Sequence, residues 1–153
     1  MEPVILTRFI IQNRLMINNI EYKINNKITV DEFTEVLVAS TLGERRPIDD
    51  RSRIEKMLSN ANLIVTAREN GKLVGVARSV SDFSYCTYLS DLAVSKTHQH
   101  RGIGKELIRK TKLAGEPAKL ILLSAPAAVD YYPKIGMTRH NHCYFLDNID
   151  SLK

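Results

Sequence analysis

The sequence predicts an α/β protein with a mixed sheet, mostly antiparallel with one parallel pair, and helices on both faces. Three observations predict this class: short apolar segments joined by tight turns, two amphipathic helical segments near the N-terminus, and a glycine-rich segment between a strand and a further helix. The length of 153 residues and the hydrophobic content of 44% suit one globular domain with a sizeable core.

The N-terminal part of this pattern is one strand followed by two helices. Residues 20–24 alternate apolar and polar side chains, which predicts a strand. Thr29 begins a capping-box pattern, and the helix that follows is expected to end at Gly43. Asp49 or Asp50 then caps a second amphipathic helix.

Three antiparallel strands and one parallel strand follow. Residues 63–67 predict a buried strand, and Asn70-Gly71 favours a tight hairpin turn into a strand over 73–80. Residues 85–94 supply the next strand, and the apolar run 119–124 predicts a strand buried on both faces. The helix between these last two strands makes them a parallel pair.

The chain is expected to close with a helix over 127–134, a turn over 135–137 and a last strand over 138–146. Residues 1–17 are expected to be an N-terminal extension, either disordered or upstream of the true start. The single domain is then residues 18–153.

Charge and composition limit the classes of function. The net charge is 22 − 17 = +5, but the basic residues are scattered, so a small anionic ligand is expected rather than nucleic acid. No apolar stretch reaches the roughly 18 residues that a membrane span needs. Cys86 and Cys143 lie far apart in the sequence and are expected to be buried thiols of a cytoplasmic protein.

The most informative segment is Gln99-His100-Arg101-Gly102-Ile103-Gly104, between a strand and a helix that starts at Lys105. Glycines allow the main chain to approach a ligand closely, and the N–H groups of a helix start attract anions. The segment does not match the dinucleotide-binding motif, which needs a third glycine where this chain has Leu107. It does not match the P-loop motif either, which needs Ser or Thr after Lys105, where this chain has Glu106. These features indicate a pyrophosphate site of another kind.

Residues 99–104 fit the pattern Gln/Arg-x-x-Gly-x-Gly/Ala and resemble the loop with which GCN5-related N-acetyltransferases (the GNAT family) bind the pyrophosphate of acetyl-coenzyme A. A second segment, from Ala128 through Tyr131-Tyr132-Pro133-Lys134 to Gly136-Met137, resembles the family's Ala-x-x-Phe/Tyr-Tyr-x-Lys-x-Gly-Phe motif. Two positions depart from the family pattern, Ala125 in place of an asparagine and Met137 in place of a phenylalanine. The resemblance spans about residues 20–146 and implies the GNAT-like acyl-CoA N-acyltransferase fold.

The resemblance also implies the cofactor-binding residues. The backbone of Leu92, Ala93 and Val94 would pair with the pantetheine arm of acetyl-CoA and face the developing oxyanion. The pyrophosphate would lie on the loop and helix start, which comprise Gln99, His100, Arg101, Gly102, Ile103, Gly104 and Lys105. No metal is implied.

The resemblance makes Tyr132 the expected general acid, which would stabilise or protonate the departing thiolate. The general base stays open between Asp91, Ser90 acting through a water, and a water chain. Strand alternation places Ser90 and Asp91 on opposite faces unless a bulge resets the register. The expected acceptor-binding side chains are Arg45, Arg46, Asp82, Phe83 and Tyr85.

The predicted function is acetyl-CoA-dependent transfer of an acetyl group to a primary amine of a small or amino-acid-like molecule, by direct attack in a ternary complex. Two alternatives remain open: transfer of a longer acyl group, and a non-catalytic acyl-CoA sensor or interaction module. A homodimer is compatible with the resemblance. The sequence does not identify the acceptor.

Overall fold

The structure is a computed structural model that describes residues 19–24 and 27–153. The extension predicted at residues 1–17 lies outside the described residues. The contacts between residues group the chain into two units, one that reaches to Leu123 and one that comprises Ser124–Lys153.

The first unit contains a five-stranded sheet whose spatial order is the order in the sequence. The strands are β1 (Ile20–Ile24), β2 (Leu63–Glu69), β3 (Lys72–Ser81), β4 (Cys86–Val94) and β5 (Lys119–Ile121). The first four pair antiparallel, and β5 pairs with β4 in parallel. The predicted mixed sheet with one parallel pair is therefore confirmed.

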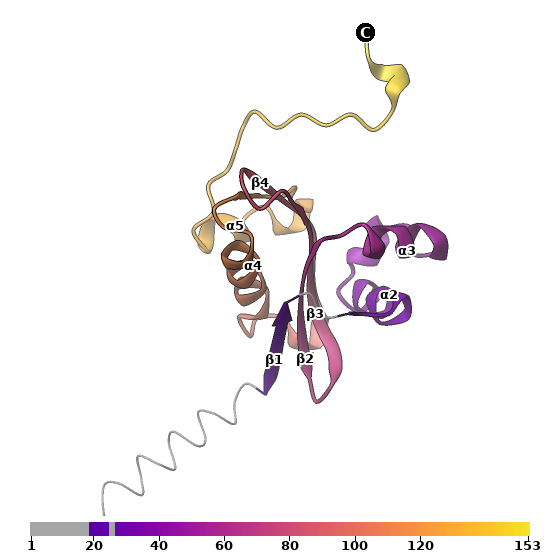
Figure 1. Ribbon diagram of the computed structural model, residues 1–153, viewed down its shortest axis with the longest axis vertical. Helices are drawn as coiled ribbons and strands as arrows, with labels where there is room; N and C mark the ends of the chain where they lie inside the picture. The colour runs from indigo at the N-terminus through magenta and orange to yellow at the C-terminus, as the bar shows by residue number, and fades with distance from the viewer. Residues whose placement is uncertain (1–18, 25–26) are drawn as a thin grey trace, which may run out of the picture. The chain divides into compact units, whose positions relative to one another are not determined.

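Helices cover both faces of this sheet (Figure 1). On one face lie α2 (Val30–Ala39) and α3 (Arg51–Ser59), and on the other lies α4 (Ile103–Ala114). The core beneath α2 and α3 consists of buried apolar side chains: Phe33, Val36, Leu37, Ile54, Leu73, Val76 and Ala93. On the opposite face α4 packs so closely that a Cβ on Gly75 would lie 3.2 Å from side-chain carbons of Ile103 and of Leu107.

The first helix begins as predicted but ends earlier. Thr29 accepts a hydrogen bond from the backbone N–H of Glu32, and Glu32 accepts one from the N–H of Thr29, which completes the capping box. The helix stops at Ala39 rather than Gly43, because Thr41 has a left-handed φ of 70° and a 3-10 turn, η1 (Leu42–Arg45), follows. Arg46, the residue after this turn, has an extended backbone, and its side chain reaches Asp91 in β4.

Removal of this cap gives a prediction for stability. Thr29→Ala is expected to lower the free energy of unfolding by about 1 kcal/mol, because the N–H of Glu32 loses its acceptor. Thr34→Ala is the matched control, since the Thr34 hydroxyl only donates to the carbonyl of Val30 within the helix, and its effect is expected within about 0.5 kcal/mol. Urea unfolding measures both; equal losses in the two variants would contradict the assigned cap.

The C-terminal predictions are partly wrong. β5 has three residues rather than six, and Lys119 and Ile121 are exposed, so it is not buried on both faces. The helix expected over 127–134 is divided into a 3-10 turn, η3 (Pro126–Ala128), and a single turn, α5 (Tyr131–Lys134). Pro133 has no N–H to donate to the carbonyl of Val129, so it fits in the first turn of a new helix but not in the interior of a continuous helix over 127–134.

No strand forms over residues 138–146, contrary to prediction. In this segment the backbone N–H of His142 donates to the ring of His140, a local bond that competes with strand pairing. A last 3-10 turn, η4 (Ile149–Ser151), follows. Cys86 and Cys143 are both exposed, so the expectation of buried thiols is also wrong.

Among the described residues no helix has both the length and the apolar character to cross a bilayer. The expected cytoplasmic location stays a prediction.

Candidate functional site

The second half of β4 has an open edge. β3 pairs with β4 on one side from Thr87 to Val94, whereas β5 pairs only with Cys86–Tyr88 on the other. Within residues 19–24 and 27–153, no strand covers Leu89–Val94 on that second side. An open edge presents backbone N–H and C=O groups to an extended partner. This edge includes Leu92, Ala93 and Val94, whose backbone is where the resemblance places the pantetheine arm.

The loop after β4 is held at the end of this edge. The turn η2 (Lys96–His98) leads into Gln99, whose side-chain amide donates to the carbonyl of Val94 at 2.9 Å. His100 and Gly102 both have left-handed backbone conformations, with φ of 61° and 80°. The chain therefore reverses direction and presents successive backbone groups just before α4 starts.

The N-terminus of α4 has no side-chain cap. Gly102 stands at the N-cap position and has no side chain that could accept from the first N–H groups of the helix. The helix is twelve residues long, so its N-terminal N–H groups and its dipole attract anions. Gly102 and Lys105 are exposed beside this helix start, and Gly104 lies in its first turn. The predicted pyrophosphate loop therefore has the geometry of an anion site.

Two side chains of the loop are bound to Glu69 at the end of β2. Arg101 donates to Glu69 at 2.8 Å, and the ring of His98 lies 2.8 Å from its other carboxylate oxygen. The hydrogen bond from Arg101, and then that from His98, lowers the pKa of Glu69 below its ordinary value. Because Arg101 is engaged with Glu69, the main chain and Lys105 are the better candidates to contact an anion.

Asp91 is fully buried between two arginines. Arg46 Nε donates to one carboxylate oxygen at 2.5 Å, and Arg78 Nε donates to the other. The exposed fraction is 0% for the Asp91 side chain and 8% for that of Arg78. A carboxylate whose two oxygens both accept from guanidinium groups is poorly placed to take a proton from an acceptor amine.

A β-bulge at Ser90 explains why Asp91 faces α3. The register pairs Arg78 with Asp91 but Ser79 with Leu89, so Ser90 is the extra residue of β4. Before the bulge, Thr87 and Leu89 are buried, and Thr87 lies under α4 at Gly115. After it, Ala93 packs in the core under α2 and α3, and so Asp91 turns to that face as well. The reset register anticipated in the sequence is present.

Tyr132 lies in the second unit, in α5. Its ring packs edge-to-face on that of Tyr131, with centroids 5.3 Å apart, and its carbonyl accepts from the N–H of Met137. Burial raises the pKa of Tyr132 above the ordinary value of 10.0, so the phenol stays protonated at neutral pH. It is therefore a hydrogen-bond donor, which suits stabilisation of a thiolate better than full proton transfer to it.

The predicted acceptor-binding residues have different surroundings. Arg46 uses its guanidinium within the fold, on Asp91 and on the carbonyls of Ser90 and Arg45, whereas the Arg45 side chain is exposed. Asp82 accepts from the N–H groups of three following residues and shapes the β3–β4 turn, and these bonds lower its pKa. Phe83 and Tyr85 are exposed on that turn.

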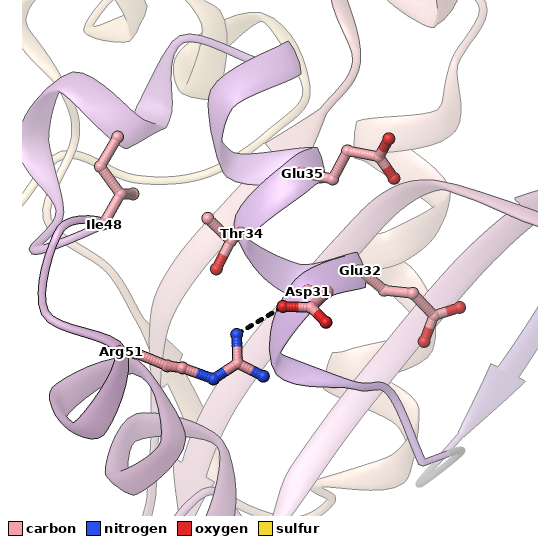
Figure 2. Close-up of a pocket in the computed structure, with 6 residues that line it drawn as sticks. All are labelled: Asp31, Glu32, Thr34, Glu35, Ile48 and Arg51. Carbon is pink, nitrogen blue, oxygen red and sulfur yellow. Dashed lines mark hydrogen bonds and ion pairs between the residues drawn. The ribbon is translucent and has the colours of Figure 1, made fainter.

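A cavity lies elsewhere in the first unit, beside α2. It has a volume of about 500 Å³ and is lined by Asp31, Glu32, Thr34, Glu35, Ile48 and Arg51. Figure 2 shows Arg51 directed at Asp31, to which it donates at 2.5 Å, with Glu32 and Glu35 extending from the same helix. None of the predicted cofactor-binding residues lines it.

The sequence matches the family described as "Acetyltransferase (GNAT) domain" over residues 25–152. The chain belongs to the GCN5-related N-acetyltransferase family. This confirms the predicted family and the predicted class of enzyme, an acyltransferase.

Similar proteins agree with this assignment. The chain is 28% identical over 123 residues to the uncharacterized N-acetyltransferase ycf52 of Pyropia yezoensis, across 75% of this chain and 68% of that protein. The structure resembles SA2161 of methicillin-resistant Staphylococcus aureus, described as a probable acetyltransferase, with a TM-score of 0.67 and 19% identity over 84% of this chain and 100% of that one. It also resembles aminoglycoside N-acetyltransferase AAC(6')-Iy in complex with CoA, with a TM-score of 0.67 and 16% identity over 85% and 95% of the two chains. The two structures confirm the fold.

Two residues that contact the predicted site residues, Arg78 and Glu69, were not predicted. Arg78 could have been predicted, because it is the one charged residue in the segment from Leu73 to Val80, as Asp91 is in the segment from Leu89 to Val94. Two opposite charges inside neighbouring antiparallel strands predict a buried pair. Glu69 has no comparable signal, since a glutamate beside a hairpin turn is ordinarily solvated.

Proposed function

We propose that this GNAT protein transfers an acetyl group from acetyl-CoA to a primary amine of a small or amino-acid-like molecule. The observation that carries the proposal is the open edge of β4 at Leu89–Val94, which leads directly into the uncapped N-terminus of α4. An amide-rich arm and a diphosphate need these two features in this order. A CoA complex of AAC(6')-Iy, which has the same fold, supports the choice of ligand.

Acetyl-CoA supplies the acetyl group as a reactive thioester. The nitrogen of the neutral amine forms a bond to the carbonyl carbon, the carbon–sulfur bond breaks, and the thiolate takes a proton. Backbone N–H groups of the β4 edge stabilise the negative charge that develops on the carbonyl oxygen. Tyr132 donates a hydrogen bond from its phenol to the departing sulfur and so stabilises the thiolate, which then takes its proton from water; because burial raises the pKa of the phenol, Tyr132 keeps its own proton.

The proton lost by the amine goes to water. Asp91 is a structural carboxylate in this proposal, since both its oxygens accept from arginines. The Ser90 hydroxyl accepts from Arg78 at 2.9 Å, which leaves its own O–H to orient that water. Ser90 thus keeps its predicted role.

The acceptor lies against the exposed side chains of Arg45, Phe83 and Tyr85. Arg46 and Asp82 are proposed to support these acceptor-binding side chains rather than to contact the acceptor, because their own polar groups are hydrogen-bonded within the fold. Relatives in fold that act on aminoglycosides, such as AAC(6')-Iy, support a small amine as acceptor.

Release of free thiol from acetyl-CoA over a panel of amines and amino acids tests the proposal. Tyr132→Phe is expected to lower kcat by about tenfold to a thousandfold with the best acceptor, because the sulfur loses its donor. Tyr131→Phe, which removes a hydroxyl from the same turn, is the matched control and is expected to keep kcat within about threefold.

Three other outcomes would contradict parts of the proposal. An unchanged rate in Tyr132→Phe would remove that residue from the reaction. Coenzyme A binding without thiol release for any acceptor would indicate a sensor rather than an enzyme. Faster release of free thiol from a longer acyl-CoA would show that this acyl-CoA, and not acetyl-CoA, is the preferred donor.

A further inference from the structure

Arg46, Arg78 and Asp91 form one connected cluster, called the arginine clamp below. Asp91 is fully buried, Arg78 is nearly so, and the Arg46 side chain is 21% exposed. The two arginines reach Asp91 from different elements, Arg46 from the segment after η1 and Arg78 from β3. The clamp therefore joins three parts of the first unit at one carboxylate.

Both arginines of the clamp also bind Ser90, the bulged residue. Arg46 Nη2 donates to the Ser90 carbonyl oxygen at 2.8 Å, and Arg78 Nη2 donates to the Ser90 hydroxyl at 2.9 Å. Each arginine thus binds the bulge and the residue that follows it. The extra residue of β4 is held at its main chain by one guanidinium and at its side chain by the other.

The remaining donors tie the clamp to the layer above the sheet. Arg78 Nη1 donates to the carbonyl of Met57 in α3 at 3.1 Å, and Arg46 Nη1 donates to the carbonyl of Arg45 in η1 at 2.8 Å. The position of Ser90 is therefore fixed relative to α3 and η1 as well as to β3. Without these hydrogen bonds, nothing would fix the bulge relative to α3 and η1.

Stability alone does not explain this cluster. A buried ion pair is often no more stabilising than apolar residues of similar volume, because both charges lose their hydration. The donors of the clamp instead converge on the residue where the β4 ladder shifts register. Bulges redirect the strand and its backbone groups, and here the redirected stretch is the open edge at Leu92–Val94.

We propose that Arg78 and Arg46 are positioning residues for acetyl transfer: through Asp91 and Ser90 they hold the β4 bulge and so aim the backbone edge that receives the thioester. This inference rests on the proposed function. Neither arginine touches the reacting atoms, so neither is a catalytic residue. A displacement of about 1 Å at such an edge lowers turnover by about 100-fold without removing a ligand contact.

The test uses Arg78→Gln and Arg46→Gln in the full chain, with Arg109→Gln as control. Arg109 forms an exposed pair with Glu106 on α4, so its loss also removes one charge and one ion pair. kcat is expected to fall about 100-fold in Arg78→Gln and about tenfold in Arg46→Gln, per folded molecule as counted by circular dichroism. KM for the acceptor and the Kd for coenzyme A are expected to stay within about threefold in both, because the loop over 99–105 is untouched.

Each result decides the proposal. A normal kcat per folded molecule in both variants would overturn it, because the clamp would then serve stability alone. If Arg78→Gln does not fold, Arg46→Gln decides, since its partly exposed side chain leaves the Arg78–Asp91 pair intact. A raised KM for carboxylate-bearing acceptors with an unchanged kcat in Arg46→Gln would show that Arg46 binds substrate, which also overturns the proposal.

Failure of the proposed function would look different. The wild-type chain would then release no thiol with any acceptor. If only the positioning role fails, the wild-type chain and both variants all turn over normally.

Discussion

Gly102→Val is expected to weaken the binding of coenzyme A by about 100-fold. Gly102 has a φ of 80°, a conformation that a β-branched residue adopts only with strain, and it caps α4 where the main chain must approach the diphosphate. A valine side chain would both shift the loop and stand between the N–H groups of the helix start and the anion. Titration calorimetry with coenzyme A measures the effect.

Gly71→Val is the matched control for this substitution. Gly71 has a φ of 83° in the β2–β3 turn, and a Cβ built at Gly71 or at Gly102 meets no heavy atom within 4 Å. The two variants are therefore expected to lose similar stability through backbone strain, about 1–3 kcal/mol. The affinity for coenzyme A should fall only in Gly102→Val; equal affinities in the two variants would contradict the assignment of the loop.

Asp91→Ala is expected to lower the free energy of unfolding by about 3–5 kcal/mol. The substitution leaves Arg78 buried and without its counter-ion, and Arg46 loses the same partner. Urea unfolding followed by circular dichroism measures the loss, and the chain is expected to approach the limit of stability for a protein of this size.

Asp31→Ala provides the comparison for Asp91. Asp31 pairs with Arg51 at 2.5 Å, but their side chains are 79% and 69% exposed. An exposed pair contributes about 0–1 kcal/mol, so this variant should unfold close to the wild type. If Asp91→Ala lowered the free energy of unfolding as little as Asp31→Ala, the arginine clamp would be solvated in solution. That result would remove the basis for its positioning role.

Local sequence rules predicted much of the fold because the signals were short in range. The capping box at Thr29, the Asn70-Gly71 turn and the glycines at the start of α4 each depend on residues within four positions of one another. The parallel pair of β4 and β5 followed from the helix between them. These features need no knowledge of distant contacts.

The rest of the site depends on residues far apart in the sequence. A single extra residue at Ser90 reverses the face of every later side chain of β4, and only the pairing with β3 reveals it. Arg78 lies 13 residues from Asp91 and Arg46 lies 45 residues away, so the clamp has no local pattern. Arg101 was predicted from its motif, but Glu69, 32 residues earlier, determines where it points.

The C-terminal strand was predicted from apolar alternation, which is a necessary condition for a strand and not a sufficient one. Strand formation needs an edge to pair with, and β5 offers three residues. In the described structure Tyr144, Phe145 and Leu146 are exposed instead. Alternation alone therefore overestimated the regular structure of residues 138–146.

Titration of the folded wild-type chain with coenzyme A, beside adenosine diphosphate and pantetheine, tests most directly whether the β4 edge and the α4 helix start form one binding site. Saturable binding of coenzyme A at one site, tighter than that of either fragment, is predicted, because the diphosphate and the amide arm contact adjoining features. Absence of heat with coenzyme A, or equal affinity for adenosine diphosphate alone, would contradict it.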